Sequence, residues 1–181
     1  MPIIIDTNCF ANVFERNSKN HPDFKPVLDW IVSGKGMMAF GGSKYLGELK
    51  KAKKYLRIIR LLKDQKKVLV GNQYEIDILQ EKISLNFPDP DFDDPHLPAI
   101  AIITKCILIC SEDMRSVRFV KNSSIYPNGF QTPSYYSSKK NLDLLCDKYV
   151  HEANKPLLKI PKTLQDVLNK NITEKLNRKK R

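Results

Sequence analysis

Short apolar runs that stop abruptly at polar residues constrain the fold of this 181-residue chain most strongly. The first run, residues 2–5, reads Pro-Ile-Ile-Ile and is followed at once by Asp6, and residues 37–40, 68–70 and 107–110 are of the same kind. Fully apolar runs of this length are typical of parallel strands that are buried on both faces. The sequence therefore predicts a buried parallel sheet.

Segments with helical periodicity separate these runs. Helices are expected over residues 9–14, 24–33, 73–82 and 96–104. A single amphipathic helix, capped by Ser43, is expected from the helical spacing of Tyr45, Leu49, Ala52, Leu56 and Ile59. Strands that alternate with helices predict an α/β fold, here a three-layer α/β/α architecture with a mostly parallel central sheet. Ligands bind such sheets beyond the carboxyl ends of the strands.

The last third of the chain predicts less regular structure. Residues 125–138 are expected to form a loop, followed by a helix over about residues 140–151, a second helix over residues 163–176 and a disordered end over residues 177–181. We divide the chain into a domain of residues 1–154 and a basic extension of residues 155–181, expected to be an RNA-affinity arm. A docked extension stays open as the alternative, because it also carries Leu157, Leu158, Leu164, Val167 and Leu168.

The charge balance favours a polyanionic partner. The chain holds 31 Lys and Arg against 20 Asp and Glu, a net charge of +11, and residues 44–67 contain ten positive and two negative side chains. Solvated helix faces can look the same. Within this segment Lys50, Lys54 and Arg57 are expected to lie near one another on one helix face and to contact phosphates.

The sequence gives no sign of a membrane segment, a disulfide framework or a zinc site. It has no apolar run long enough to span a bilayer and no signal-peptide pattern at its start, so a cytoplasmic location is expected. The four cysteines lack paired spacing and are expected to be buried, reduced thiols, and the three histidines show no ligand spacing with them. These residues are Cys9, Cys106, Cys110 and Cys146, and His21, His96 and His151.

Carboxylates mark the ends of the predicted strands. Asp6 follows the first strand and Asp113 the last, while Glu48 lies in the first turns of the basic helix and Asp94 precedes the helix of residues 96–104. Carboxylates that converge near a core repel one another unless a cation neutralises them, and Mg²⁺ or Mn²⁺ binds through oxygen alone. Three polar residues could orient carboxylates or water, or simply cap turns: Thr7, Asn8 and Ser111.

Four motifs together resemble the PIN-domain nucleases over roughly residues 2–120. They are Asp-Thr-Asn after the first strand, an acidic residue in the helix after the second strand, an Asp before an Ala-containing helix, and Ser-Glu-Asp after a later strand. The resemblance implies cleavage of single-stranded RNA with Mg²⁺ or Mn²⁺, and, for many stand-alone bacterial members, the toxin role of a toxin–antitoxin pair. It implies that Asp6, Asp94 and Asp113 are metal ligands and that Glu48 acts directly or through water.

Two details depart from the family pattern. Pro98 stands inside the third motif's helix and is expected to delay the start of that helix. Asp93 and Asp94 compete for the ligand position, and the five-residue step from Asp94 to Ala99 favours Asp94.

Three other functions remain open. A catalytically inactive RNA-binding module would use the same fold and basic surface, and an interaction protein would only dock a protein partner. A phosphatase would need a second Asp at position 8, where the chain has Asn8. Besides RNA, the candidate partners are an antitoxin protein and a second copy of the chain in a homodimer; no membrane partner is expected.

Overall fold

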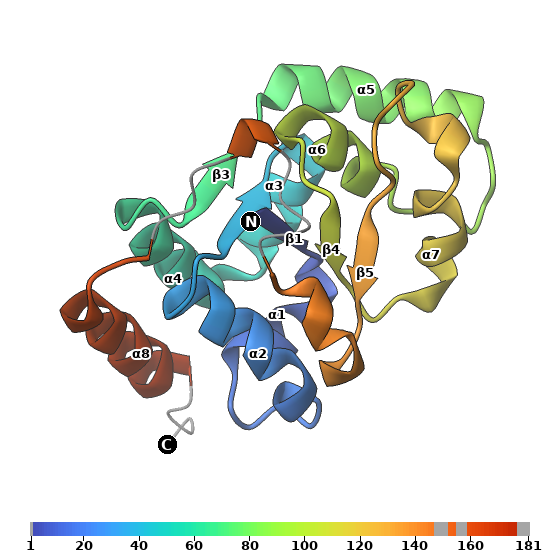
Figure 1. Cartoon of the computed structure of the whole chain (residues 1–181). Coiled ribbons are helices and arrows are strands. Elements are labelled where there is room, and N and C mark those ends of the chain that lie inside the picture. The colour runs from blue at the N-terminus through green and yellow to red at the C-terminus, as the bar shows by residue number, and fades with distance from the viewer. Residues whose placement is uncertain (1, 147–151, 155–158, 177–181) are drawn as a thin grey trace.

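A five-stranded, all-parallel sheet forms the centre of the computed structural model, which describes residues 2–146, 152–154 and 159–176. The strand order is β3-β2-β1-β4-β5 (Figure 1). The strands are β1 (Pro2–Ile5), β2 (Met37–Phe40), β3 (Val68–Val70), β4 (Leu108–Cys110) and β5 (Ser134–Tyr136). The predicted α/β fold with a parallel sheet is confirmed.

Helices cover both faces of this sheet. They are α1 (Phe10–Phe14), α2 (His21–Val32), α3 (Ser43–Lys51), α4 (Lys53–Asp64), α5 (Gln73–Asn86), α6 (His96–Thr104), α7 (Met114–Val120) and α8 (Lys162–Leu176). Short 3-10 turns are η1 (Thr7–Cys9), η2 (Ser123–Ile125), η3 (Lys139–Leu144) and η5 (Glu152–Asn154). The pair α5 and α6 lies over one face and the pair α1 and α2 over the other (Figure 1), which completes the three layers.

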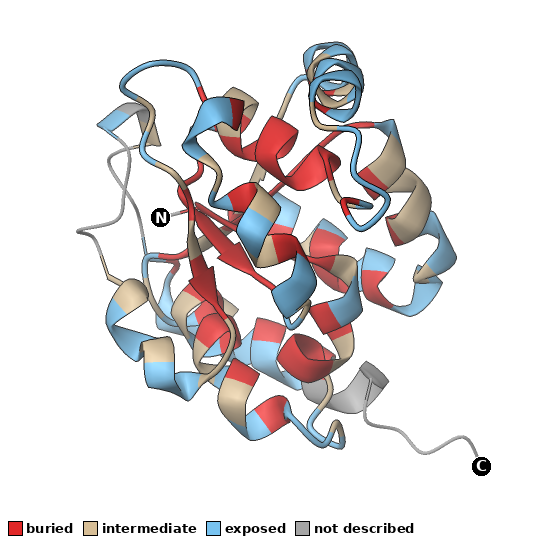
Figure 2. Cartoon of the chain, turned by 90° about the vertical axis from the view of Figure 1, so that its right-hand side faces the viewer, coloured by how far each residue is buried: buried red, intermediate tan, exposed pale blue. Residues whose placement is uncertain are grey.

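The core explains why these short strands are stable. Ile3, Ile4 and Ile5 of β1 are fully buried, because β1 has a strand on each side and a helix layer on each face. Strands β1, β2, β4 and most of β5 form one buried core with the inner faces of the helices (Figure 2), whereas the edge strand β3 is only partly buried. Pro98 does not delay α6, which begins at His96, because a proline in the first helical turn lacks only an N–H that has no helical partner there.

The basic segment forms two helices instead of the single predicted one. The helix breaks at Ala52, whose ψ of 47° is not helical. Leu56, expected on the apolar stripe, is 39% exposed, whereas α4 buries Tyr55, Ile58, Ile59 and Leu62. Gly42, not Ser43, is the residue that precedes the first turn of α3.

The predicted loop of residues 125–138 is also wrong in part, because Ser134–Tyr136 forms the edge strand β5 beside β4. The helix expected over residues 140–151 is replaced by the 3-10 turn η3, and residues 147–151 lie outside the described residues, as do residues 177–181. The described cysteines are free thiols; Cys9, Cys106 and Cys110 are buried and Cys146 is half-buried. No helix in the described part of the chain is long and apolar enough to cross a membrane.

The C-terminal extension contributes to the core. Helix α8 packs against α4 and α2, and its Leu168 and Ile172 are 2% and 3% exposed. Ile160, just before α8, is buried as well. These contacts favour the docked alternative over a free arm; the domain boundary at residue 154 stays a prediction.

Candidate metal centre

The acidic residues gather where the strand order reverses. The chain proceeds from β1 to β2 and β3 on one side, and β4 and β5 fill the other side. In a doubly wound sheet, the crevice beyond the carboxyl ends of the two strands at this switch point is the usual ligand site. Asp6 directly follows β1 and Ser111 directly follows β4, so both residues stand at this crevice.

Asp6 is held at the end of β1 by Cys110, the last residue of β4, and by Ser111, which follows it. Its backbone N–H donates to the carbonyl oxygen of Cys110 at 2.9 Å, and the hydroxyl of Ser111 donates to Asp6 Oδ2 at 2.7 Å. Burial raises the pKa of the Asp6 carboxyl, against the hydrogen bonds from Ser111 and Asn8, and the charge of Glu48 raises it further. Asp6 is therefore a buried acid beside a second acid, as the strand-end pattern predicted.

Helix α3 brings Glu48 to the same place. The hydroxyl of Tyr45 on α3 donates to the carbonyl oxygen of Ile5, which ties the helix to the end of β1. The hydroxyl of Thr7 donates to Glu48 Oε2 at 2.8 Å, so Thr7 orients this carboxylate. An open hollow beside Glu48 is lined by Thr7, Asn8, Glu48, Lys51 and Ala52. The predicted supporting roles of Thr7 and Ser111 thus have a geometric basis.

Asp94 ends a loop that is fixed from two sides. Arg118 of α7 donates to Asp91 Oδ2 at 2.7 Å, while Lys44 donates to the backbone carbonyl of Asp93 and places its ammonium 3.8 Å from Asp94 Oδ1. Burial raises the pKa of Asp94 to about 7; the charge of Asp6 adds to this rise and Lys44 opposes it. Asp6 and Asp94 are thus close enough to repel each other.

Asp113 caps α7 and is paired to a neighbouring arginine. The Arg115 guanidinium donates to both Asp113 carboxylate oxygens, at 2.9 Å and 3.1 Å, and holds the pKa of Asp113 below its usual value. One oxygen each from Asp93, Asp94 and Asp113 lies within 4.8 Å of the others, so these three carboxylates form a candidate site for a divalent cation. The structure thus brings both Asp93 and Asp94 to Asp113, where the sequence favoured Asp94 alone.

Three neighbours of the acids were missed at the level of sequence. Lys44 lay unmarked in the basic run, and Arg115 follows Asp113 by only two residues, a spacing that allows a local ion pair. His96 was judged only against the cysteines, although its position two residues after Asp94 at the start of a helix was a usable signal.

The proposed phosphate-binding residues do not share one helix. Lys50 is on α3, whereas Lys54 and Arg57 are on α4 beyond the break at Ala52. Lys50 and Arg57 are exposed, but Lys54 pairs with Glu15 at 2.6 Å. Another exposed basic surface runs along α4 beside Leu56, formed by Lys53, Arg57 and Arg60.

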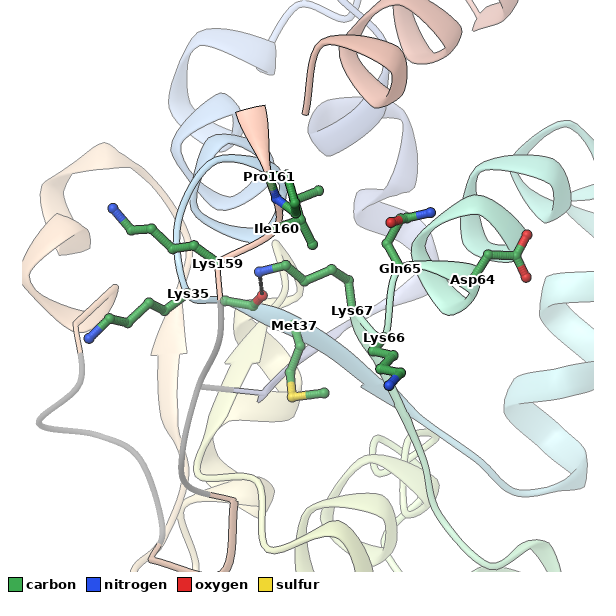
Figure 3. A pocket seen from close by; sticks show the side chains of 10 residues that line it. Lys35, Met37, Asp64, Gln65, Lys66, Lys67, Lys159, Ile160 and Pro161 are labelled. Carbon is green, nitrogen blue, oxygen red and sulfur yellow. Dashed lines mark hydrogen bonds between the residues drawn. The ribbon is translucent and has the colours of Figure 1, made fainter. Parts of the chain in front are cut away.

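A separate cavity of about 300 Å³ lies at the opposite, amino-terminal end of β2 and β3 (Figure 3). Lys67 donates there to the carbonyl oxygens of Gly34 and Gly36, at 2.9 Å and 3.0 Å, while the side chains of Lys35 and Lys159 point away from it. The amino groups of these three lysines therefore do not converge on one ligand position. The cavity lies at the end of the sheet opposite to the carboxylates.

Comparisons of this chain with known protein families, curated proteins and solved structures give no match. Function is therefore inferred from the chemistry of the carboxylates and the surface around them.

Proposed function

We propose that this protein is a metal-dependent endoribonuclease that cleaves single-stranded RNA. The observation that carries the proposal is the convergence of Asp93, Asp94 and Asp113, with Asp6 and Glu48 beside them, at the switch point of a parallel sheet. Burial and neighbouring acids raise the pKa values of Asp6 and Asp94, and a hard divalent cation would stabilise these two carboxylates in their charged form. The Asp-Thr-Asn and Ser-Glu-Asp motifs, which resemble those of PIN-domain nucleases, support the same chemistry.

The residues divide into those that would hold the ion and those that would hold the substrate. Asp6, Asp94 and Asp113 would bind Mg²⁺ or Mn²⁺, with Ser111 orienting Asp6 and Thr7 orienting Glu48. The ion supplies a water of lowered pKa and stabilises charge on the phosphorane.

Lys51 lines the hollow beside Glu48 and is exposed, and in this proposal it would contact a phosphate of the RNA. The basic surface of α4, with Arg57 and Arg60, would extend that contact along the backbone. The free thiols accord with a cytoplasmic enzyme. A toxin role, with an antitoxin or a second copy of the chain as partner, is a further part of this proposal.

The test is cleavage of an end-labelled single-stranded RNA by the purified chain. We expect product with Mg²⁺ or Mn²⁺ and none with a chelator. We expect Asp6→Asn and Asp113→Asn each to lower the rate about 100-fold or more, because each removes a ligand charge. The matched control is Asp29→Asn, which removes an exposed carboxylate that pairs with Lys25 on α2.

Two results would decide against the proposal. If the chain binds RNA but cleaves none with any divalent ion, it is the inactive RNA-binding module. If it neither binds nor cleaves RNA, the basic surface serves another partner and the interaction-protein alternative stands.

A further inference from the structure

His96, the first residue of α6, lies between two of the acids. Its side chain is 1% exposed. Its Nε2 is 4.0 Å from Glu48 Oε2, and its Nδ1 is 3.8 Å from Asp94 Oδ1. Neither ring nitrogen has a hydrogen-bond partner among the described residues. A buried imidazole whose two nitrogens both face carboxylates without bonding them requires an explanation.

The other described histidine shows what ordinary burial looks like. His21 is also buried, but its Nδ1 lies 2.8 Å from the backbone oxygen of Asn12, at hydrogen-bond distance. A structural role alone therefore accounts for His21 and leaves the polar atoms of His96 unexplained.

The distances around His96 fit coordination better than hydrogen bonding. A hydrogen bond from a ring nitrogen to oxygen spans about 2.7–3.2 Å. Two atoms that each lie about 2.1 Å from one shared ion can be as far as about 4.2 Å apart. The 4.0 Å between His96 Nε2 and Glu48 Oε2 falls outside the first range and within the second.

Charge favours the Glu48 side of the ring over the Asp94 side. The Lys44 ammonium is 3.8 Å from Asp94 Oδ1, the same oxygen that faces His96 Nδ1, so this oxygen already has a cationic partner. Glu48 instead accepts a neutral hydroxyl from Thr7 and borders the open hollow.

We propose that His96 Nε2 is a nitrogen ligand that shares a divalent ion with Glu48, and that it gives the centre a preference for Mn²⁺ over Mg²⁺. This inference rests on the metal centre of the proposed function. Mg²⁺ takes oxygen ligands almost exclusively, whereas imidazole nitrogen raises the affinity of a site for transition metals. Such an ion would also satisfy the buried Nε2.

Pulsed electron paramagnetic resonance of the full chain loaded with Mn²⁺ tests the proposal directly. We expect ¹⁴N hyperfine coupling from a histidine, and we expect it to change to the ¹⁵N pattern when the wild-type chain is labelled with ¹⁵N-histidine. The coupling should disappear in His96→Gln and persist in His21→Gln, the matched buried histidine.

Calorimetric titration of the same proteins gives the second measurement. His96→Gln should weaken Mn²⁺ binding about 10- to 100-fold and leave Mg²⁺ binding nearly unchanged. If His96→Gln fails to fold, a histidine coupling that persists in both His21→Gln and His151→Gln assigns the coupling to His96, because the sequence holds three histidines. Mn²⁺ bound without histidine coupling would overturn the role of His96 and leave the carboxylate centre intact. No Mn²⁺ binding at all would overturn the metal centre and the His96 proposal together.

Discussion

Buried carboxylates are the residues that most distinguish this chain from an ordinary α/β domain. Asp6 is 5% exposed at the end of a strand whose other side chains are apolar, and Asp94 sits near it with a raised pKa. A site that desolvates several like charges lowers the stability of the metal-free protein. Binding of a cation is expected to raise the free energy of unfolding again.

Asp94→Asn should reveal this cost through the pH dependence of stability. The pKa of Asp94 is about 7 in the folded protein against 3.8 for the ordinary group. Between these values the folded state retains a proton that the unfolded state has released, so the free energy of unfolding falls as pH rises from about 4 to about 7 and stays low above that. Asp94→Asn should flatten this fall and stabilise the metal-free protein above pH 7.

Urea denaturation across this pH range in the presence of a chelator measures the effect. Asp29→Asn, an exposed acid in an ion pair on α2, should leave the curve unchanged. A curve for Asp94→Asn that parallels the wild type would show that this carboxyl ionises normally.

At the scale of the elements, most strands could be predicted from the sequence. The strand β5 and the break in the basic helix could not. β1, β2 and β4 were predicted because a buried parallel strand needs an apolar run and little else. The edge strand β3 has the same apolar signature although it is only partly buried. β5 was missed because its sequence, Ser-Tyr-Tyr, is not an apolar run. Contacts with distant residues hold it in the sheet: it pairs with β4, and the Tyr136 hydroxyl donates to the carbonyl oxygen of Asp23 at 2.8 Å.

The helix break at Ala52 has no local sequence signal, since neither Gly nor Pro stands there. It accompanies distant contacts, among them the hydrogen bond of the Tyr55 hydroxyl to Glu15.

The candidate site, too, could be predicted from the sequence only in part. Strand-end acids can be found from sequence, whereas the placement of Lys44 beside Asp94 and of Glu48 beside His96 depends on how α3 packs.

Gly42 controls the start of the helix that carries Glu48. Its φ is +79°, and a Cβ there would lie 2.5 Å from the Cγ2 of Ile76. Gly42→Ala should therefore lower the free energy of unfolding by about 1–3 kcal/mol, through strain and this clash. Thermal denaturation checks it.

Gly47, in the same helix, is the matched control. Apart from its chain neighbours and the nearby backbone of its own helix, no described atom lies within 4 Å of the point that a Cβ would occupy there, so Gly47→Ala should stabilise the helix by about 0.5–1 kcal/mol. Equal effects of the two substitutions would mean that Gly42 does not constrain the start of α3.

At the scale of the whole molecule, the C-terminal helix joins the body of the protein although its segment is basic. Leu168 is 2% exposed, whereas the adjacent Val167 is 50% exposed. Leu168→Ala should cost about 2–4 kcal/mol of unfolding free energy, because it leaves a cavity, and Val167→Ala should change it by about 0.5 kcal/mol or less. Chemical denaturation of both variants measures the difference, and a neutral Leu168→Ala would restore the RNA-arm interpretation.

The basic surface should determine how RNA binding responds to salt. Arg57→Gln and Lys50→Gln should each weaken binding and lower the slope of log affinity against log salt by about 1, because each removes one phosphate contact. Lys25→Gln, on α2 and paired with Asp29, is the control that should leave the slope unchanged. Fluorescence anisotropy over a salt series measures the slope. An unchanged slope for Arg57→Gln and Lys50→Gln would assign these residues to solubility.

The central position of β1 has a consequence for a chain that is still being made. β1 is synthesised before the other four strands and can pair with β2 soon afterwards, but its other edge stays unpaired until β4, far along the sequence, has been made. Until then Asp6 lacks the Ser111 hydroxyl, and Asp113 has not been synthesised. A nascent chain that stops before β4 therefore holds no assembled carboxylate centre, so any activity of that centre begins only after β4 and Asp113 have been synthesised.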